Sequence, residues 1–339
     1  MSNLKTNPVI TIHDRPNSYI GRSVPRPNAK RLLHGRGNFT DDVRLPRMLH
    51  SAYLRSPHAH AEILSIDTSK AEAAPGVIAV VTGKDVAEIC EPYVGVLTHL
   101  QGMRSPPQYP LAMDRARWQG EPVVAVAAGT RAEAEDALEL ISVEYKELPA
   151  VTDMEAALEP DAPKIWDEYG DNLCWERLGG EGDVETALAN SAYVAEAVFD
   201  FGRHTGVTLE PRSIIADYNS GEGRLTVHHS TQGPHMMQAI IAKAFQLEEH
   251  NVRIIADDVG GAFGIKIHTY GDELAAVALS ILLKRPVKFI ADRLESFTAD
   301  IHARDHIIKG RMGVDADGKI TAIDYDDITG IGPFSMYPR

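Results

Sequence analysis

The stretch from Ser230 to Lys266 decides how this chain folds. It opens with STQGPH at residues 230–235 and closes with DVGGAFGIK at residues 258–266. Between the two runs, the spacing of apolar residues predicts a helix followed by a short strand. A lone side-chain amide, that of Gln232, then stands at one strand end and a glycine-rich loop follows the next strand. Such features meet at the sheet edge where α/β folds bind ligands.

The two features suit contact with a bulky ligand. Glycine lets backbone N–H groups approach closely, because no Cβ stands in the way, and Gln232 can donate and accept hydrogen bonds without a charge. Without further context, two simpler interpretations stay open. Gln232 could cap a backbone group at the end of its strand, and the glycines could form an ordinary tight turn. The loop matches neither GxGxxG nor a Walker motif, since Ile267 follows Lys266. The candidate site residues are Gln232, Gly260, Gly261, Ala262, Phe263 and Gly264.

Composition limits the class of protein. The 339 residues are 44% hydrophobic and 24% charged, with a net charge of −14. This balance predicts a packed core and argues against nucleic-acid or anionic-membrane partners. No apolar run reaches membrane-spanning length and the N-terminal residues are polar with no hydrophobic signal core, so we expect a cytoplasmic protein. The 2 cysteines are too few for an iron–sulfur cluster held by this chain alone.

The pattern along the chain predicts an α+β protein in four parts. We expect an extended arm over 1–25, a first domain over 26–150, a proline-rich connector over 151–170 and a second domain over 171–339. A capping box at Thr130 and Glu133 predicts the start of a helix. Further predicted elements are strands at 77–81, 121–128, 141–145, 225–229, 252–256 and 286–291, helices at 237–245 and 274–282, and a hairpin turn at 315–318.

The sequence ends on glycines and aromatic residues over 330–339, with no helix cap or polar tail. This pattern leads us to expect that the fold continues in another polypeptide, or that the chain is a fragment.

Short motifs in both halves of the chain resemble those of a known family. In the first region these are GRGNFTDD (35–42), RSPHAHA (55–61) and PGV (75–77). In the second they are LEPR (209–212), STQ (230–232), GGAFG (260–264), RPVK (285–288) and Asp292-Arg293 with Glu295. The chain resembles the N-terminal half of the molybdopterin-binding subunit of the xanthine dehydrogenase and aldehyde oxidase family. It is most similar to the bacterial branch that includes the large subunit of aerobic carbon monoxide dehydrogenase.

The resemblance implies a fold and a cofactor. The fold would be an α/β hammerhead domain followed by the first, incomplete molybdopterin-binding domain. The cofactor would be molybdenum–molybdopterin cytosine dinucleotide, shared with a chain that carries the second half. That half would also carry the catalytic glutamate, so no catalytic residue is expected here. Pterin sulfurs hold molybdenum in this family, so no protein metal ligand is expected either. FAD and [2Fe-2S] would belong to partner subunits.

The resemblance also implies roles for the candidate residues. Gln232 would contact an oxo ligand of molybdenum, and the backbone of 260–264 would face the pterin, with Phe263 walling the site. Purine-oxidising members have a glutamate where this chain has Ile267. A purine substrate is therefore disfavoured, and an aldehyde, another heteroaromatic compound or carbon monoxide stays open.

Other interpretations fit the sequence less well. A zinc site at His58 and His60 lacks further ligands at suitable spacing, and Arg212 is expected to form a buried ion pair. A nucleotide-binding role would need an acidic residue after the glycine-rich loop to hold the ribose, and this sequence has no clear candidate in the right strand context. The main alternative function is a truncated, non-catalytic docking fragment, which would bind no pterin even beside partner subunits.

Overall fold

The computed structural model describes residues 19, 23–95 and 100–334. The chain divides into one unit that ends at Asn38 and a second that begins at Phe39. In the first unit the described residues form helix α1 (Ala29–Leu33). The predicted arm over 1–25 lies almost entirely outside the described residues. All of the predicted site residues belong to the second unit.

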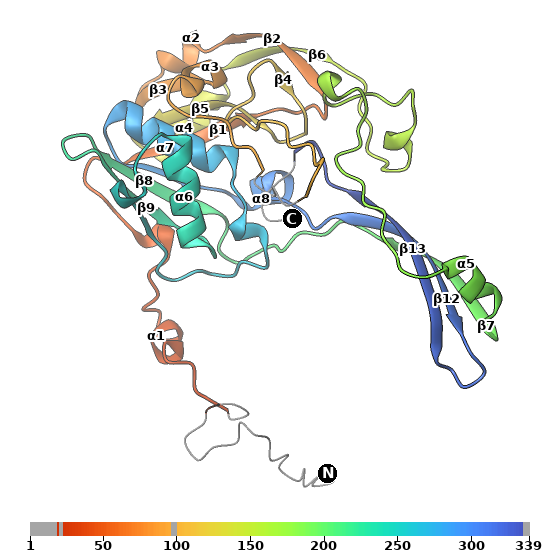
Figure 1. Ribbon diagram of the computed structural model, residues 1–339. Coiled ribbons are helices and arrows are strands. Elements are labelled where there is room, and N and C mark those ends of the chain that lie inside the picture. Colours follow the sequence, from red (N-terminus) through yellow and green to blue (C-terminus); the bar gives the residue numbers. More distant parts are fainter. Residues whose placement is uncertain (1–18, 20–22, 96–99, 335–339) are drawn as a thin grey trace. The chain divides into compact units, whose positions relative to one another are not determined.

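A seven-stranded mixed sheet organises the second unit (Figure 1). Its strands lie in the order β10-β9-β8-β11-β1-β5-β3. The pairs β10–β9 and β11–β1 are parallel, and the other neighbours are antiparallel. The bounds are β1 (Leu49–Arg55), β3 (Val77–Thr82), β5 (Pro122–Ala128), β8 (Ser213–Asn219), β9 (Arg224–His229), β10 (Val252–Ile255) and β11 (Val287–Ile290).

This sheet joins two regions that are far apart in the sequence. Strands β1, β3 and β5 come before the predicted connector, whereas β8 to β11 come after it. The seam is the parallel pair β1–β11, in which Leu49 faces Val287 and His50 faces Lys288. The mixed helix and strand content confirms the predicted α+β class. The boundaries drawn at 150 and 170 stay a prediction.

Helices cover both faces of the sheet. Every residue of β5 is buried, and its side chains alternate between the faces. Ala125 and Ala127 pack in the cluster that contains α6 and α7, whereas Val126 and Ala128 pack with α4. The bounds of these helices are α4 (Arg131–Leu138), α6 (Pro234–Ala244) and α7 (Gly271–Leu283).

The local signals in the sequence explain why these elements form. The Thr130 hydroxyl accepts a hydrogen bond from the Glu133 N–H, and the Glu133 carboxylate accepts one from the Thr130 N–H. This confirms the predicted capping box. Pro234 occupies the first turn of α6, where its missing N–H costs nothing. The other strands and helices predicted from periodicity are confirmed to within a few residues.

Two three-stranded sheets complete the second unit, in the orders β4-β2-β6 and β13-β12-β7. Their bounds are β2 (Ala61–Asp67), β4 (Arg115–Ala116), β6 (Ser142–Glu147), β7 (Tyr193–Phe201), β12 (Asp305–Val314) and β13 (Ile320–Gly330). The predicted turn at 315–318 joins β12 to β13, with Gly318 in the left-handed region. The remaining helices are α2 (Ser69–Glu72), α3 (Gly83–Ala87), α5 (Val184–Ala189) and α8 (Arg293–Ala299). In the described part of the chain, no helix has the length and apolar character needed to cross a membrane.

Candidate functional site

The end of strand β9 and the glycine-rich loop are bonded to each other. The backbone N–H of Gln232 donates to the carbonyl oxygen of Lys266 at 3.1 Å. The Thr231 hydroxyl donates to the same oxygen at 2.9 Å. The structure therefore brings Gln232 beside the loop at 260–264, as the order of strands predicted. The two features meet at one edge of the seven-stranded sheet.

The glycines of the loop are required by its conformation. A Cβ at Gly260 would lie 2.4 Å from the Cβ of Glu210, closer than real side chains approach. Gly264 has a φ of +90°, in the left-handed region that favours glycine. The loop therefore lies tightly against the 209–212 motif and then turns sharply before the short 3₁₀ turn at Ile265–Ile267.

The loop and Gln232 present hydrogen-bond donors that the described residues do not use. No described acceptor receives a hydrogen bond from the backbone N–H groups of 261–264 or from the exposed side-chain amide of Gln232. Phe263 is 78% exposed and has a φ of +49°. A bulky residue in that conformation is strained, and such strain is concentrated at ligand sites.

A buried clamp fixes the loop from beneath. The Lys266 Nζ, whose side chain is fully buried, donates to Glu210 Oε2 at 3.0 Å and to Ser230 Oγ at 2.7 Å. The same Glu210 oxygen accepts the Gly260 N–H and the Ser230 hydroxyl, each at 2.7 Å. Burial lowers the pKa of Lys266, and the Glu210 carboxylate opposes that shift. One carboxylate oxygen thus joins the 209–212 motif, the strand end and the loop.

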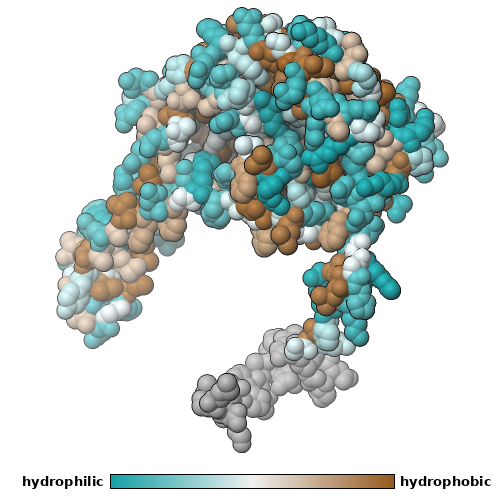
Figure 2. All heavy atoms as spheres, turned by 180° about the vertical axis from the view of Figure 1, so that it is seen from behind, coloured by the Kyte–Doolittle hydropathy of each residue, from teal (hydrophilic) through white to brown (hydrophobic). Residues whose placement is uncertain are grey.

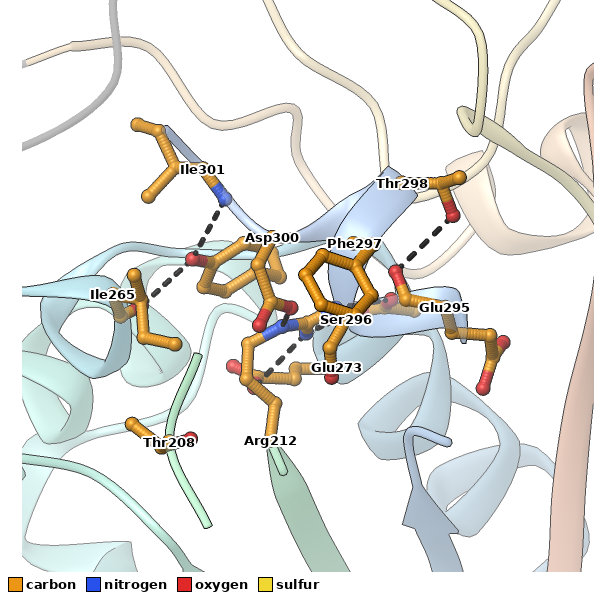
Figure 3. A network of polar contacts seen from close by, with 12 residues as sticks. Thr208, Arg212, Ile265, Glu273, Glu295, Ser296, Phe297, Thr298, Asp300 and Ile301 are labelled. Carbon is orange, nitrogen blue, oxygen red and sulfur yellow. Dashed lines mark hydrogen bonds and ion pairs between the residues drawn. The ribbon is translucent and has the colours of Figure 1, made fainter. Parts of the chain in front are cut away.

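A second buried cluster is centred on Arg212 (Figure 3). The Arg212 guanidinium is fully buried and donates to Asp272 at 2.7 and 2.9 Å, to Glu273 at 3.2 Å and to Asp300 at 2.5 Å. Arg55 adds a further ion pair with Asp272 at 2.8 Å. The predicted buried ion pair of Arg212 is therefore confirmed, with more carboxylates than the sequence suggested.

The carboxylates of this cluster respond differently to burial. Burial alone would raise the pKa of Asp272, but Arg212 and Arg55 hold it well below its ordinary value. At Asp300 burial dominates, and its pKa is raised in spite of Arg212. Asp272 therefore stays ionised between the two arginines.

Tyr270 connects the Arg212 cluster to the glycine-rich loop. The Arg212 guanidinium lies 3.7 Å from the centre of the Tyr270 ring. The Tyr270 hydroxyl donates to the carbonyl oxygen of Ile265 at 2.7 Å and accepts the Ile301 N–H at 3.2 Å. In Figure 3 the dashed lines from Ile265 and Ile301 meet at one oxygen atom. The end of the loop is therefore braced by the ion cluster.

A cavity of about 220 Å³ opens beside the same cluster. Its lining includes Arg55, Tyr270, Asp272 and Asp300, and it includes neither Gln232 nor any residue of 260–264 among those that the structure describes. The cavity is thus distinct from the glycine-rich edge.

Three of the histidines near these motifs make structural contacts. His60 Nδ1 lies 2.9 Å from the carbonyl oxygen of Pro149, and the His58 ring packs on Tyr145. His229 Nε2 lies 3.1 Å from Glu273 Oε2. Within the described residues, no group of three or more His, Cys, Asp and Glu side chains is placed to hold a metal ion.

Comparison with known families identifies the chain. The family described as "Molybdopterin cofactor-binding domain" matches residues 165–338. The family described as "Aldehyde oxidase and xanthine dehydrogenase, a/b hammerhead domain" matches residues 34–149. The chain belongs to the molybdopterin-binding subunits of the xanthine dehydrogenase and aldehyde oxidase family. This confirms the predicted hammerhead domain and partial molybdopterin-binding domain, and the match to the molybdopterin-binding domain contains all six predicted cofactor-binding residues.

Individual relatives agree with this membership. The molybdopterin-binding chain is 35% identical to the nicotine 6-hydroxylase large subunit of Paenarthrobacter nicotinovorans, covering 94% of this chain and 39% of the relative. It is 34% identical to the carbon monoxide dehydrogenase large chain of Afipia carboxidovorans, covering 95% and 41%. The crystal structure of quinoline 2-oxidoreductase from Pseudomonas putida 86 matches with a TM-score of 0.89 at 38% identity, covering 93% of this chain and 40% of that one.

The chain thus spans about 40% of the length of these relatives. One relative is covered more fully. The nicotinate dehydrogenase large molybdopterin subunit of Eubacterium barkeri is 31% identical, and 72% of it is covered.

Some contacts within the molybdopterin-binding domain were not predicted from the sequence. Glu210 and Ser230 lie in the LEPR and STQ motifs, but no motif indicates that they meet Lys266, and the brace through Tyr270 has no motif. A signal for the acidic cluster did exist, because Asp272 and Glu273 open a helix that is otherwise apolar through Leu279. Acidic residues so placed are expected to pair with a buried cation.

Proposed function

We propose that this chain supplies one half of a molybdopterin cofactor site, formed by Gln232 and the loop at 260–264. The observation that carries the proposal is the group of unused donors at this edge. The N–H groups of 261–264 and the Gln232 amide have no described acceptor. They lie within the region that matches the molybdopterin cofactor-binding domain. Donors without acceptors suit a cofactor that is rich in oxygen, nitrogen and sulfur.

Gln232 and the residues of the loop would bind and orient the cofactor through hydrogen bonds and shape. The loop N–H groups would donate to acceptors on the cofactor, as in other glycine-rich cradles. The Gln232 amide would donate to an oxygen near the metal without placing a charge there. When bound, the cofactor supplies the two-electron oxidation of a carbon centre with oxygen from water. Phe263, the exposed side chain of the loop, would exclude water from the same face.

The position of Ile267 bears on the substrate. A Cβ at Gly233 would lie 3.4 Å from the Ile267 side chain, so Ile267 is next to the residue that follows Gln232. An aliphatic side chain cannot hydrogen-bond a purine ring. The proposal therefore disfavours purines and takes an aldehyde, another heteroaromatic compound or carbon monoxide as the substrate class.

The proposal extends to partners. A further polypeptide region, equivalent to the part of the relatives that this chain does not match, would complete the site and carry the catalytic glutamate. The cofactor would be the cytosine dinucleotide form, and electrons would pass to iron–sulfur and FAD subunits of a cytoplasmic complex. Support comes from the coverage of about 40% of most relatives and from a relative named as a large molybdopterin subunit, of which 72% is covered.

The test is molybdenum content in the complex with that region, measured by elemental analysis beside oxidative release of the pterin. Gly264→Ala and Gly318→Ala form a matched pair, since both glycines have positive φ (+90° and +83°) and neither hypothetical Cβ meets an atom within 4 Å. The two changes cost similar backbone strain. We expect cofactor to be lost from Gly264→Ala and kept by Gly318→Ala.

Two results would overturn the proposal. Equal molybdenum in both variants would remove the loop from the cofactor site. Absence of molybdenum and pterin from the wild-type complex would favour the alternative, a non-catalytic docking fragment.

A further inference from the structure

The sheet β13-β12-β7 has two unlike faces. Side chains alternate along each strand, and the register places the large residues of one face opposite each other. Phe199 of β7 faces Ile308 of β12, and Met312 faces Ile323 of β13. We name this side the apolar face and define it by its most exposed large residues. These are Tyr193, Phe199, Phe201, Met312, Ile323 and Tyr325, each between 41% and 70% exposed.

The other side of the sheet is charged and partly covered. Helix α5 packs on it through Leu188, which is buried as is Ala322 of β13. Arg311 pairs with Glu185 of the helix at 2.5 Å and with Asp324 at 2.6 Å. This side therefore has a helix of the same chain packed on it and carries most of the charged side chains of the sheet.

The apolar face has the character of an uncovered interface. Its polar groups gather toward one end, where His306 lies 3.1 Å from both Asp327 and Thr329. The rest is aromatic and aliphatic, and apolar atoms gather over this sheet at the left of Figure 2. Soluble monomers rarely expose so many large apolar side chains together. Aromatic and methionine enrichment with few charges is typical of the centre of an interface.

The apolar face is also connected to the proposed cofactor edge. Strand β7 ends at Phe201, and a Cβ at Gly206 would lie 2.9 Å from the Phe263 Cβ. The same segment is tied to the start of β12 by the bridge between His204 and Ala303. The segment that follows β7 therefore links the sheet to the loop at 260–264.

We propose that the apolar face docks the region of the subunit that this chain lacks relative to its relatives. The inference rests on the proposed function, because it names the partner that completes the same site. The relatives hold about 60% of their length beyond the part that this chain matches, so the partner is large enough to cover the face. A second copy of this chain is the weaker occupant, because two chains of net charge −14 repel each other.

Neighbouring residues of β7 provide the test. Phe199 lies on the apolar face and Val198 on the charged side, and they are 52% and 65% exposed. Phe199→Asp and Val198→Asp thus place the same charge one residue apart on opposite faces. The chain and its variants are titrated with the polypeptide of the same source that matches the uncovered region, and binding is followed by size-exclusion chromatography and interferometry. Circular dichroism checks that each variant stays folded.

We expect Phe199→Asp to weaken binding by about 100-fold or more, because it would bury an unpaired charge. Val198→Asp should stay within about threefold of wild type, and Tyr325→Asp on β13 should repeat the loss. Undiminished binding by Phe199→Asp would overturn the proposal. So would a wild-type chain that dimerises by itself and becomes monomeric in Phe199→Asp, because the occupant would then be a second copy.

Molybdenum analysis of the same samples separates the two ideas. A wild-type complex that forms without molybdenum contradicts the proposed function, and the variants still decide the docking face. A molybdenum-loaded complex that tolerates Phe199→Asp contradicts only the docking face.

Discussion

The guanidinium of Arg212 lies 3.7 Å from the centre of the Tyr270 ring. Because the Tyr270 hydroxyl donates to Ile265, this stack links a fully buried cation to the end of the glycine-rich loop. The loop is thus positioned by charges that do not contact its unused N–H groups. Changes in the ion cluster should therefore reach the loop through Tyr270.

Tyr270→Phe tests that link. The variant keeps the stack on Arg212 but leaves the Ile265 carbonyl and the Ile301 N–H without their partner. We expect a loss of about 1–3 kcal/mol in the free energy of unfolding, measured in urea, and weaker cofactor retention in the complex. Tyr193→Phe is the control, because Tyr193 is 69% exposed. Equal stability of the two variants would contradict the brace.

Arg212→Met should destabilise the chain strongly. The change leaves Asp272, Glu273 and Asp300 buried without their shared cation. Removing one partner of a buried ion pair costs about 3–5 kcal/mol. In Arg131→Met the lost pair with Glu135 is largely exposed, and such pairs are worth about 0–1 kcal/mol. A similar loss in the two variants, by chemical denaturation, would show that the cluster contributes little.

Gln232→Ala should separate function from stability. The side chain is exposed and has no described partner, so the free energy of unfolding should change by less than about 0.5 kcal/mol. If the amide acts on charge near the metal, kcat of the reconstituted enzyme should fall by about 100-fold. Gln101→Ala, at another exposed glutamine, should leave kcat unchanged. An unchanged kcat in Gln232→Ala would remove the amide from the site.

Glu121 predicts a pH dependence of stability. Burial raises the pKa of Glu121 to about 7, although its carboxylate accepts the Arg117 N–H at 2.6 Å. The folded state then binds the proton more tightly than the unfolded state, whose carboxyl has a pKa of about 4.3. Stability contributed by this group is therefore lost as pH rises from about 4.3 to 7.

Glu121→Gln should remove that loss. The difference in unfolding free energy between the variant and wild type should grow toward pH 8, on the order of 1–3 kcal/mol. Glu139→Gln, at an exposed position, should show no such trend. A difference that stays constant from pH 5 to pH 8 in urea titrations would contradict the raised pKa.

The local elements could be predicted because their signals are local. The spacing of Met237, Ile241 and Ala244 and the cap at Thr130 are read within one helix, and the structure has both helices. The meeting of Gln232 with the loop at 260–264 followed from strand order. The family likeness predicted the two domains that the family comparisons confirm.

The long-range partners could not be predicted. Arg212 and Asp300 are 88 residues apart, and Lys266 and Glu210 are 56 apart. No periodicity within an element indicates which distant charge will share a buried site. The seam between Leu49 and Val287 is hidden for the same reason, since nothing within the short strands LHSAYLR (β1) and VKFI (β11) indicates that they are neighbours. The apolar face was missed because alternation alone does not say which side is covered.

The seam between β1 and β11 has a consequence for protein engineering. A chimaera that exchanges the first 150 residues between family members would cut through one continuous sheet, although the exchange point falls in a loop. The grafted β1 would have to match the foreign β11 through Leu49–Val287 and His50–Lys288. Cassettes for shuffling these enzymes should therefore carry β1 and β11 from the same parent.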